Sequence, residues 1–264
     1  MGIVNVTPDS FSDGGRHGDS DAAVAHGLAL VAQGADILDI GGESTRPFSE
    51  PVEAAEEWRR VGAVVGRLAR EAGVPISIDT SKAAVAARAL DAGVEIVNDV
   101  TGLEGDPDML RVVSDAGAGV CAMHMQGTPQ TMQIDPHYGD VVGEIRDYLG
   151  RRRDALLAAG IPLDRICLDP GIGFGKTHEH NLELMRHARR LLDLGVPILV
   201  GHSRKGFLTK VLRSTTAREP TEAERDAATA GAACGLAAAG IQIVRVHAVA
   251  TVRATLDVFA ACAG

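Results

Sequence analysis

The chain has 264 residues with 45% hydrophobic and only 3% aromatic content. A core of this composition must consist of Val, Ile, Leu and Ala, as in a buried parallel sheet covered by helices. The formal net charge of −9 argues against nucleic acid or an anionic membrane surface as the main partner, although a local cationic pocket can still hold an anionic small molecule.

The cysteines and the hydropathy pattern indicate the compartment. The thiols, which form no close pair and no metal or redox motif, are Cys121, Cys167, Cys234 and Cys262. Such cysteines typically act as small, buried hydrophobic residues of proteins in a reducing environment. We read no apolar run of about 18 residues and no signal peptide, and we therefore expect a soluble, cytoplasmic protein without a membrane partner.

Apolar runs that alternate with longer polar segments predict strand–helix pairs along the whole chain. The expected strands are Gly2–Val6, Asp36–Ile40, Pro75–Ile78, Glu95–Val97, Gly119–Met123, Arg165–Leu168, Pro197–Val200 and Gln242–Val246. The expected helices are Asp21–Gln33, Pro51–Glu71, Lys82–Ala92, Pro107–Ala116, Val141–Ala159, Glu179–Leu194, a short helix followed by Thr221–Ala239, and Ala250–Ala261. Glycines at the helix ends indicate left-handed stops, namely Gly34, Gly73, Gly93, Gly117, Gly160, Gly195 and Gly240.

Strands and helices that alternate through eight units favour a parallel (β/α)₈ TIM barrel, in a single α/β domain over residues 1–264. An open, doubly wound sheet is the alternative. The chain reaches its first strand almost immediately, although a barrel usually has a segment covering its N-terminal mouth. The recorded Met1 is therefore a doubtful natural start.

Polar residues follow every expected strand, whereas the strand starts are apolar. These segments are 5–9, 41–46, 79–82, 98–101, 124–126, 169–175, 201–205 and 245–247. Ligands of such barrels bind at the C-terminal ends of the strands. The repeated asymmetry therefore predicts one functional site at that mouth.

The acids Asp79 and Asp169, together with Asn98, suit a flat, nitrogen-rich heterocycle. Carboxylates accept hydrogen bonds from ring N–H and amino groups, and an amide both donates and accepts. The alternative for each acid is an internal salt bridge or a helix cap, and Asp79 in particular is placed to cap the helix near Lys82. The glycines that follow Asp169 leave room for a ligand, or merely make a tight turn.

Basic residues after the last two strands suggest an anion site. Arg245 and His247 are two apart on a strand and share a face, so a cationic pair facing Asn5 would bind phosphate groups. Arg245 could instead pair with an acid of a neighbouring strand. Of Arg204 and Lys205, we expect one to face the pocket and the other to be a surface charge.

Metal binding would rest on few protein groups. The Asn5 amide oxygen could complete the shell of Mg²⁺ together with a ligand diphosphate, since magnesium takes few protein ligands and several waters. The remaining histidines lack ligand spacing, and a zinc site is not expected.

Two polar loops are long for their position, Thr7–Ser20 and Glu43–Glu50. Such loops often order over a substrate and exclude water, although they could simply be long connections.

The motifs along the chain resemble those of the dihydropteroate synthase family. They are residues 5–15, 39–47, 77–80, 98–100, 168–176, 203–205 and 245–247, in the family's order and over practically the full chain. The resemblance implies a barrel enzyme of folate biosynthesis. Such an enzyme joins 6-hydroxymethyl-7,8-dihydropterin diphosphate to p-aminobenzoate and releases diphosphate with Mg²⁺. It is also expected to be a homodimer and to bind sulfonamides in competition with p-aminobenzoate.

The resemblance also implies residue roles. Asp79, Asn98 and Asp169 look like the pterin-binding set, with Ser203 and Lys205 beside it. Arg245, His247 and Asn5 resemble the diphosphate and magnesium groups. Thr45 and Arg46, with Asp9 and Phe11 of the first loop, look like the covers of the p-aminobenzoate site. Lys205, Asp9 and Arg245 are the expected catalytic residues.

Departures from the family pattern leave two rival functions open. Ala248 stands where an acid usually follows the final histidine, Phe48 replaces a loop glycine, and Gly206 replaces a larger or polar residue. A catalytically silent pterin-binding paralogue is one rival. The other is a methyltetrahydrofolate–corrinoid methyltransferase, which has no need of the two long loops.

Overall fold

The computed structural model describes residues 1–6 and 15–263, with side chains from residue 20 onward after the gap. A parallel sheet runs through six strands in chain order. These strands are β1 (Gly2–Asn5), β2 (Leu38–Gly41), β3 (Ile76–Asp79), β4 (Ile96–Asp99), β5 (Gly119–Met123) and β6 (Ile166–Asp169). Within the described residues, β7 (Leu199–Val200) and β8 (Ile243–Val244) form a separate parallel pair.

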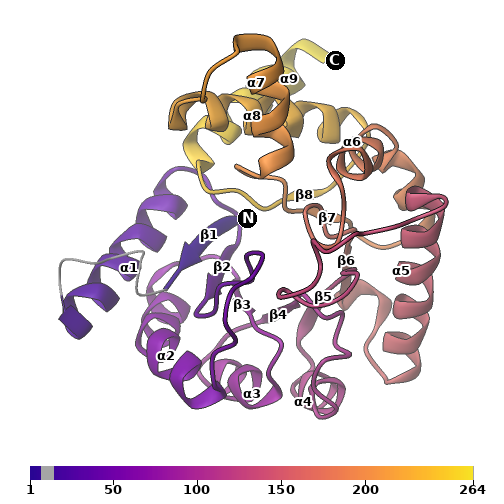
Figure 1. The fold of residues 1–264 in the computed structure, drawn as a ribbon. Coiled ribbons are helices and arrows are strands. Elements are labelled where there is room, and N and C mark those ends of the chain that lie inside the picture. Colours follow the sequence, from indigo (N-terminus) through magenta and orange to yellow (C-terminus); the bar gives the residue numbers. More distant parts are fainter. Residues whose placement is uncertain (7–14, 264) are drawn as a thin grey trace.

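Isolated bridges join the two sheets into a ring. Leu168 of β6 bridges Ile198 before β7, and Gly2 of β1 bridges Val246 after β8, both in parallel. The Ile3 amide donates to the Val246 carbonyl at 3.1 Å, and the Leu168 amide donates to the Pro197 carbonyl at 3.0 Å. The predicted α/β barrel is therefore confirmed, and the open sheet is excluded (Figure 1).

The helices surround the strands, as Figure 1 shows. They are α1 (Gly15–Ala32), α2 (Ala54–Glu71), α3 (Ala83–Asp91), α4 (Met109–Ala116), α5 (Val141–Ala158), α6 (His178–Arg186), α7 (Gly206–Thr216), α8 (Glu222–Ala238) and α9 (Val249–Ala263). Short 3₁₀ helices are η2 (Leu163–Arg165) and η3 (Ala188–Leu194). The helix predicted over Glu179–Leu194 is thus divided at His187, where α6 gives way to η3.

Strand alternation separates the core from the site. Val4, Ile40, Ile78, Val97 and Leu168 are buried in the layer between the strands and the helices. The residues between them face the barrel axis, and they become polar toward the strand ends. The helix stops also agree with the sequence, because Gly34, Gly73, Gly93, Gly117, Gly160, Gly195 and Gly240 all have positive φ.

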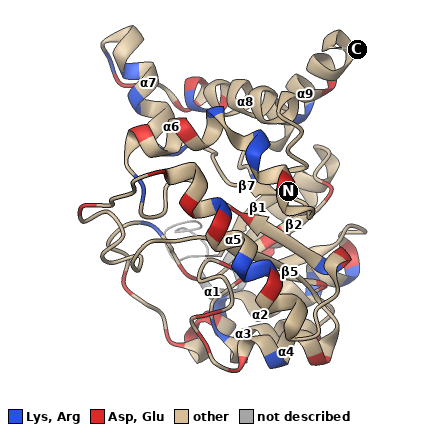
Figure 2. Ribbon diagram, turned by 90° about the vertical axis from the view of Figure 1, so that its right-hand side faces the viewer, with Lys and Arg blue, Asp and Glu red and all other residues tan. Residues whose placement is uncertain are grey.

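The outer surface carries mixed charge. Basic and acidic residues are interspersed along the helices, as the blue and red segments of α5 show (Figure 2). None of the described helices has the length and apolar character needed to cross a membrane.

Candidate active site

A cavity of about 1430 Å³ opens at the C-terminal ends of the strands. It is lined by every predicted site residue that the structure describes, namely Asn5, Thr45, Arg46, Asp79, Asn98, Asp169, Ser203, Lys205, Arg245 and His247. Asp9 and Phe11 lie outside the described residues. Side chains up to 242 positions apart in the chain therefore meet around one space, because the parallel strands all end at the same mouth.

The segment after β6 needs its glycines. Gly171 has φ of 67°, and a Cβ there would lie 1.9 Å from the His124 carbonyl oxygen. Gly175 has φ of 61°, and its Cβ would approach the Gln126 carbonyl oxygen to 2.5 Å. The Gly171 amide donates to Asp169 Oδ1 at 2.7 Å, which fixes the carboxylate at the start of the turn. The turn is tight, and it also shapes the cavity wall through Gly173.

Arg245 pairs with two carboxylates of neighbouring strands. Its Nε donates to Asp39 Oδ2 at 2.5 Å and its Nη2 to Asp79 Oδ2 at 2.7 Å. The alternative prediction, that Arg245 pairs with an acid of a neighbouring strand, is therefore confirmed. The helix-cap reading of Asp79 is wrong, because Asp106 accepts the Ala83 amide at the start of α3.

Asp39 is the residue of this cluster that received no role from the sequence. It is fully buried in β2 and also accepts from Asn98 Nδ2 at 3.1 Å. Its second oxygen, Oδ1, has no hydrogen-bond partner among the described residues. The sequence feature that could have indicated a role for Asp39 is its position as an acid in an otherwise apolar strand, two residues before a pair of glycines.

Burial raises the pKa values of the acids. Asp79 has its pKa raised to about 7, chiefly by burial, against the opposing effect of Arg245. Burial likewise raises the pKa of Asp169, while Lys205 acts to lower it. Two carboxylates around one guanidinium thus carry excess negative charge in a dry environment, which disfavours full ionisation.

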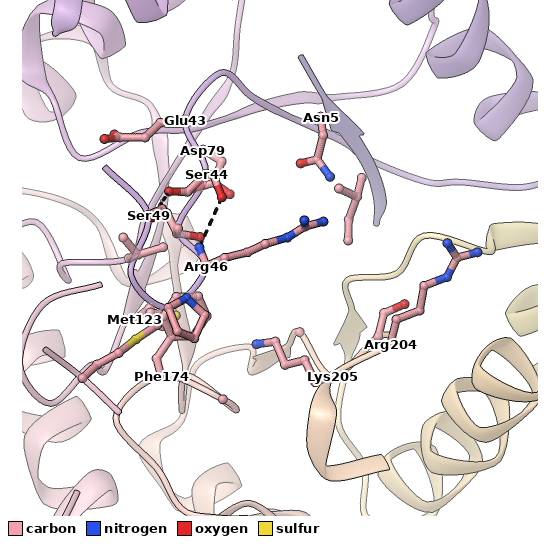
Figure 3. Close-up of a pocket in the computed structure, with 18 of the residues that line it drawn as sticks. Asn5, Glu43, Ser44, Arg46, Ser49, Asp79, Met123, Phe174, Arg204 and Lys205 are labelled. Atoms are coloured by element: carbon pink, nitrogen blue, oxygen red, sulfur yellow. Dashed lines mark hydrogen bonds between the residues drawn. The ribbon is translucent and has the colours of Figure 1, made fainter. Parts of the chain in front are cut away.

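Lys205 and Arg204 point in different directions, as expected for neighbours on a turn (Figure 3). Lys205 extends into the cavity, donates from Nζ to the Ile172 carbonyl and lies 4.5 Å from the centre of the Phe174 ring. Burial lowers the pKa of Lys205 to about 8, opposed by Asp169. Arg204 is held instead by Asp226 of α8, with Nε at 2.6 Å and Nη2 at 2.9 Å from its oxygens.

His247 and Ser203 form a pair at the cavity wall. The Ser203 hydroxyl lies 3.0 Å from His247 Nδ1 and accepts from the His247 amide at 3.2 Å. Burial lowers the pKa of His247 to about 4, so its imidazole is neutral at pH 7. The expected cationic pair is therefore wrong in this structure: Arg245 carries the charge and His247 does not.

Lys176 and His124 form a buried contact that the sequence reasoning did not assign. Lys176 Nζ lies 3.1 Å from His124 Nδ1 and donates to the Phe174 carbonyl at 2.8 Å. Burial lowers the pKa of Lys176 well below its usual value and that of His124 to about 3. Lys176 therefore holds the turn that carries Phe174.

The loop between β2 and α2 forms another wall of the cavity, with Arg46 extending across it in Figure 3. Phe48 has φ of 64° and its side chain is exposed. That left-handed conformation is the physical reason why glycine suits this position. At Gly206, an added Cβ would meet open space, so a larger residue would fit there.

Metal-binding groups are sparse in the described part of the chain. No three His, Cys, Asp or Glu side chains there lie together in a way that could hold an ion. Asn5 lines the cavity with a single amide. The donor set therefore fits a magnesium ion held mainly by a ligand's phosphate oxygens and water, and does not fit a closed protein site.

Comparisons with known proteins agree with this geometry. Residues 1–247 match a family described as pterin binding enzyme. Dihydropteroate synthase of Neisseria meningitidis serogroup C is 46% identical over 260 residues, 97% of this chain and 89% of that protein. The Escherichia coli K12 enzyme is 41% identical, over 94% of this chain and 85% of its own.

Solved structures give the same picture. Xanthomonas albilineans dihydropteroate synthase with 4-aminobenzoic acid superposes with a TM-score of 0.91 at 45% identity, covering 100% of this chain and 92% of that one. The same enzyme in complex with 7,8-dihydropteroate gives 0.87 at 43% identity, covering 100% and 93%. A Yersinia pestis dihydropteroate synthase with a sulfonamide drug complex gives 0.91 at 40% identity, covering 100% and 93%.

Proposed function

We infer the chemistry of the cavity from the premise that the chain belongs to the dihydropteroate synthase family of pterin-binding enzymes. Its reaction condenses 6-hydroxymethyl-7,8-dihydropterin diphosphate with p-aminobenzoate to give 7,8-dihydropteroate and diphosphate. The observation that carries this function for the chain itself is the convergence of buried acids, an amide and cations from separate strand ends on one cavity.

Asp79, Asn98 and Asp169 are the proposed pterin-binding residues. The ring offers N–H and amino donors, which match the two carboxylates and the Asn98 amide oxygen. Burial destabilises the charged forms of Asp79 and Asp169, and hydrogen bonds from the bound ring would stabilise them. The acids therefore fix the orientation of the ring and, with it, the direction of its reactive methylene group.

Arg245 is the proposed link between the ring and the diphosphate. Asp39 and Asp79 occupy its Nε and Nη2, while Nη1 has no hydrogen-bond partner among the described residues. That remaining donor is available to a phosphate oxygen. The neutral His247 and the Ser203 hydroxyl would add hydrogen bonds rather than charge.

Cleavage of the carbon–oxygen bond next to the electron-rich ring leaves a stabilised cation, and no enzymic nucleophile is required. The site must stabilise the departing negative charge and hold the amine in line. Lys205, a cation at neutral pH beside Asp169, would stabilise charge next to the ring. Asp9 is proposed as a further catalytic residue and Phe11 as part of the amine cover, from the first loop.

Thr45 and Arg46 are the proposed amine-side residues of the second loop. Arg46 extends across the cavity toward Asn5 in Figure 3, and its guanidinium suits a carboxylate. Mg²⁺, when bound with the diphosphate, would neutralise the leaving group. Asn5 is the proposed protein ligand.

We also propose that the protein is a homodimer that works in the cytoplasm. The free thiols among the described residues suit a reducing compartment. Size-exclusion chromatography with light scattering measures the assembly directly.

Steady-state release of diphosphate, measured with and without p-aminobenzoate, tests the function. Amine-dependent release that requires Mg²⁺ is the expected result. Tight pterin binding without turnover would indicate the silent paralogue, and methyl transfer from a methylated folate would indicate the corrinoid-dependent rival.

A further inference from the structure

Glu43, Lys82 and Glu57 form a charged cluster at the foot of the loop that carries Thr45 and Arg46. Lys82 Nζ donates to Glu43 Oε2 at 2.5 Å and to Glu57 Oε2 at 2.7 Å. The Glu57 side chain is fully buried, and the Glu43 and Lys82 side chains are 16% and 21% exposed. None of the roles assigned above uses these three residues, although Glu43 also lines the cavity.

Glu43 closes the loop on itself. Its Oε1 accepts the Val52 amide at 2.8 Å, so one carboxylate joins the first residue of the loop to a residue just beyond its end. Its Oε2 joins both to Lys82, which directly precedes α3. Arg60 of α2 adds a further attachment, because its Nη1 donates to the Gly42 carbonyl at 3.0 Å.

The tip of the loop is held less firmly than its foot. The Phe48 amide donates to the Pro129 carbonyl at 3.0 Å, and Gln130 Nε2 donates to the Ser49 carbonyl at 3.1 Å. Phe48 and Gln130 are exposed, and both hydrogen bonds join uncharged groups, whereas the foot is held by ion pairs. Thr45 and Arg46 lie between tip and foot, so the direction in which they face the cavity depends on where the foot is fixed.

We propose that Glu43, fixed by Lys82 and Glu57, is a positioning residue that holds Thr45 and Arg46 in place for the amine substrate. This inference rests on the proposed function, because it assigns the loop to the amine side of the cavity. A loop already ordered before binding loses less conformational freedom when the amine binds, which raises affinity without a new contact. Glu43 itself does not need to touch the substrate.

The charges explain why the cluster is stable in this arrangement. Glu57 is buried on α2 and needs a cation, which Lys82 supplies. Removal of Lys82 would leave two neighbouring carboxylates without compensation, one of them buried, and would threaten the fold. Removal of the Glu43 carboxylate leaves the Lys82–Glu57 pair intact. Glu43→Ala is therefore the variant that releases the loop and keeps the fold.

The matched control is Glu50→Ala. Glu50 belongs to the same loop, lines the same cavity and loses the same charge on substitution, but it takes no part in the contacts that Glu43 makes with Val52 and Lys82. Lys82→Arg is the conservative variant, since arginine can still bridge the two carboxylates.

The experiment measures KM for p-aminobenzoate, direct binding of the pterin substrate, and hydrogen exchange of the loop amides. Glu43→Ala is expected to raise KM for the amine about tenfold, to change pterin affinity less than twofold, and to accelerate exchange at Val52. Glu50→Ala should match the wild type in all three, and Lys82→Arg should retain most of the amine affinity.

Two outcomes would overturn the inference. One is an unchanged amine KM together with unchanged exchange at Val52 in Glu43→Ala. The other is an equal loss of affinity for both substrates with a lowered melting temperature, which would mean a merely structural role. Failure of the proposed function is seen separately, as absent amine-dependent turnover in the wild type, and the exchange measurement at Val52 still reports on the loop.

Discussion

The Lys205 ammonium group is buried beside Phe174 and Asp169. We therefore expect activity to depend on whether Lys205 is protonated. Its pKa is lowered from the usual 10.5 to about 8, because burial disfavours the ammonium form more than Asp169 favours it. The side chain is therefore charged at pH 7 and loses its proton within an accessible alkaline range.

Substitution of Lys205 should have a large effect on turnover. Lys205→Ala removes the cation beside the ring, and turnover is expected to fall about 100-fold or more. The wild-type kcat/KM should decline as pH rises above about 8, and Lys205→Arg should move that decline to higher pH. Rate profiles between pH 6 and 10 provide the measurement, with circular dichroism as the control for folding. Near-normal kcat/KM in Lys205→Ala would show that the residue has another role.

We expect pterin binding to release a proton from Asp79. Because the pKa of Asp79 is about 7, its carboxyl group is largely protonated at pH 6 in the protein without ligand. The N–H donors of a bound ring favour the ionised carboxylate instead. Binding at pH 6 should therefore release close to one proton, and affinity should increase as pH rises through 7. Calorimetry in two buffers with different ionisation enthalpies measures the release. Asp79→Asn should abolish it, and proton release that persists in this variant would assign the proton to another group.

Asp169 should contribute to affinity through hydrogen bonds that an amide cannot reproduce. Asp169→Asn leaves the shape of the side chain nearly unchanged but turns one acceptor into a donor against the ring. Pterin binding is expected to weaken by about 1–3 kcal/mol, the cost of a mispaired buried polar group. Isothermal calorimetry with the pterin substrate decides the matter, and an unchanged dissociation constant would remove Asp169 from the pterin-binding set.

Among the elements, the turn after β6 and helix α8 use glycine for different reasons. Gly171 has a left-handed conformation, and a Cβ there would overlap the His124 carbonyl oxygen, so its missing side chain is essential. Gly231 lies within α8, where a Cβ would meet nothing within 4 Å. The two positions therefore respond in opposite ways to the same substitution.

The two alanine variants test this distinction. Gly171→Ala is expected to lower the free energy of unfolding by about 1–3 kcal/mol, since the chain must shift to relieve the overlap. Gly231→Ala should raise it by about 0.5–1 kcal/mol through lower entropy of the unfolded chain. Urea denaturation of both variants gives the values. A neutral Gly171→Ala would mean that the turn is looser than the contact with His124 indicates.

At the level of the molecule, the ring of strands was predictable because each unit repeats the same local pattern. An apolar run, a polar strand end, a helix and a glycine stop recur with little interruption, and parallel strands then bring the polar ends to one mouth. The break between α6 and η3 was not predictable, because residues 179–194 contain no glycine or proline that would mark it, and yet the backbone leaves the helical conformation at His187 with φ of −108° and ψ of 17°.

The partners of charged residues were harder to predict than their location. That Arg245 faces the cavity follows from strand alternation, but its pairing with Asp39 and Asp79 depends on the distance between neighbouring strands. The partners of Lys82 were equally hard to predict, because the three residues of this cluster come from a loop, a helix and the start of another helix. Burial, which lowers the pKa of His247, is likewise a property of the assembled barrel.

In the proposed function, buried acids from separate strands bind the pterin ring while the loop after β2 covers the amine. A crystal structure with pterin diphosphate, Mg²⁺ and p-aminobenzoate would test it most directly. We expect the ring within hydrogen-bond distance of Asp79, Asn98 and Asp169, with the amine substrate beneath Thr45 and Arg46. A ring bound elsewhere in the cavity, with these acids still engaged only by protein groups, would contradict it.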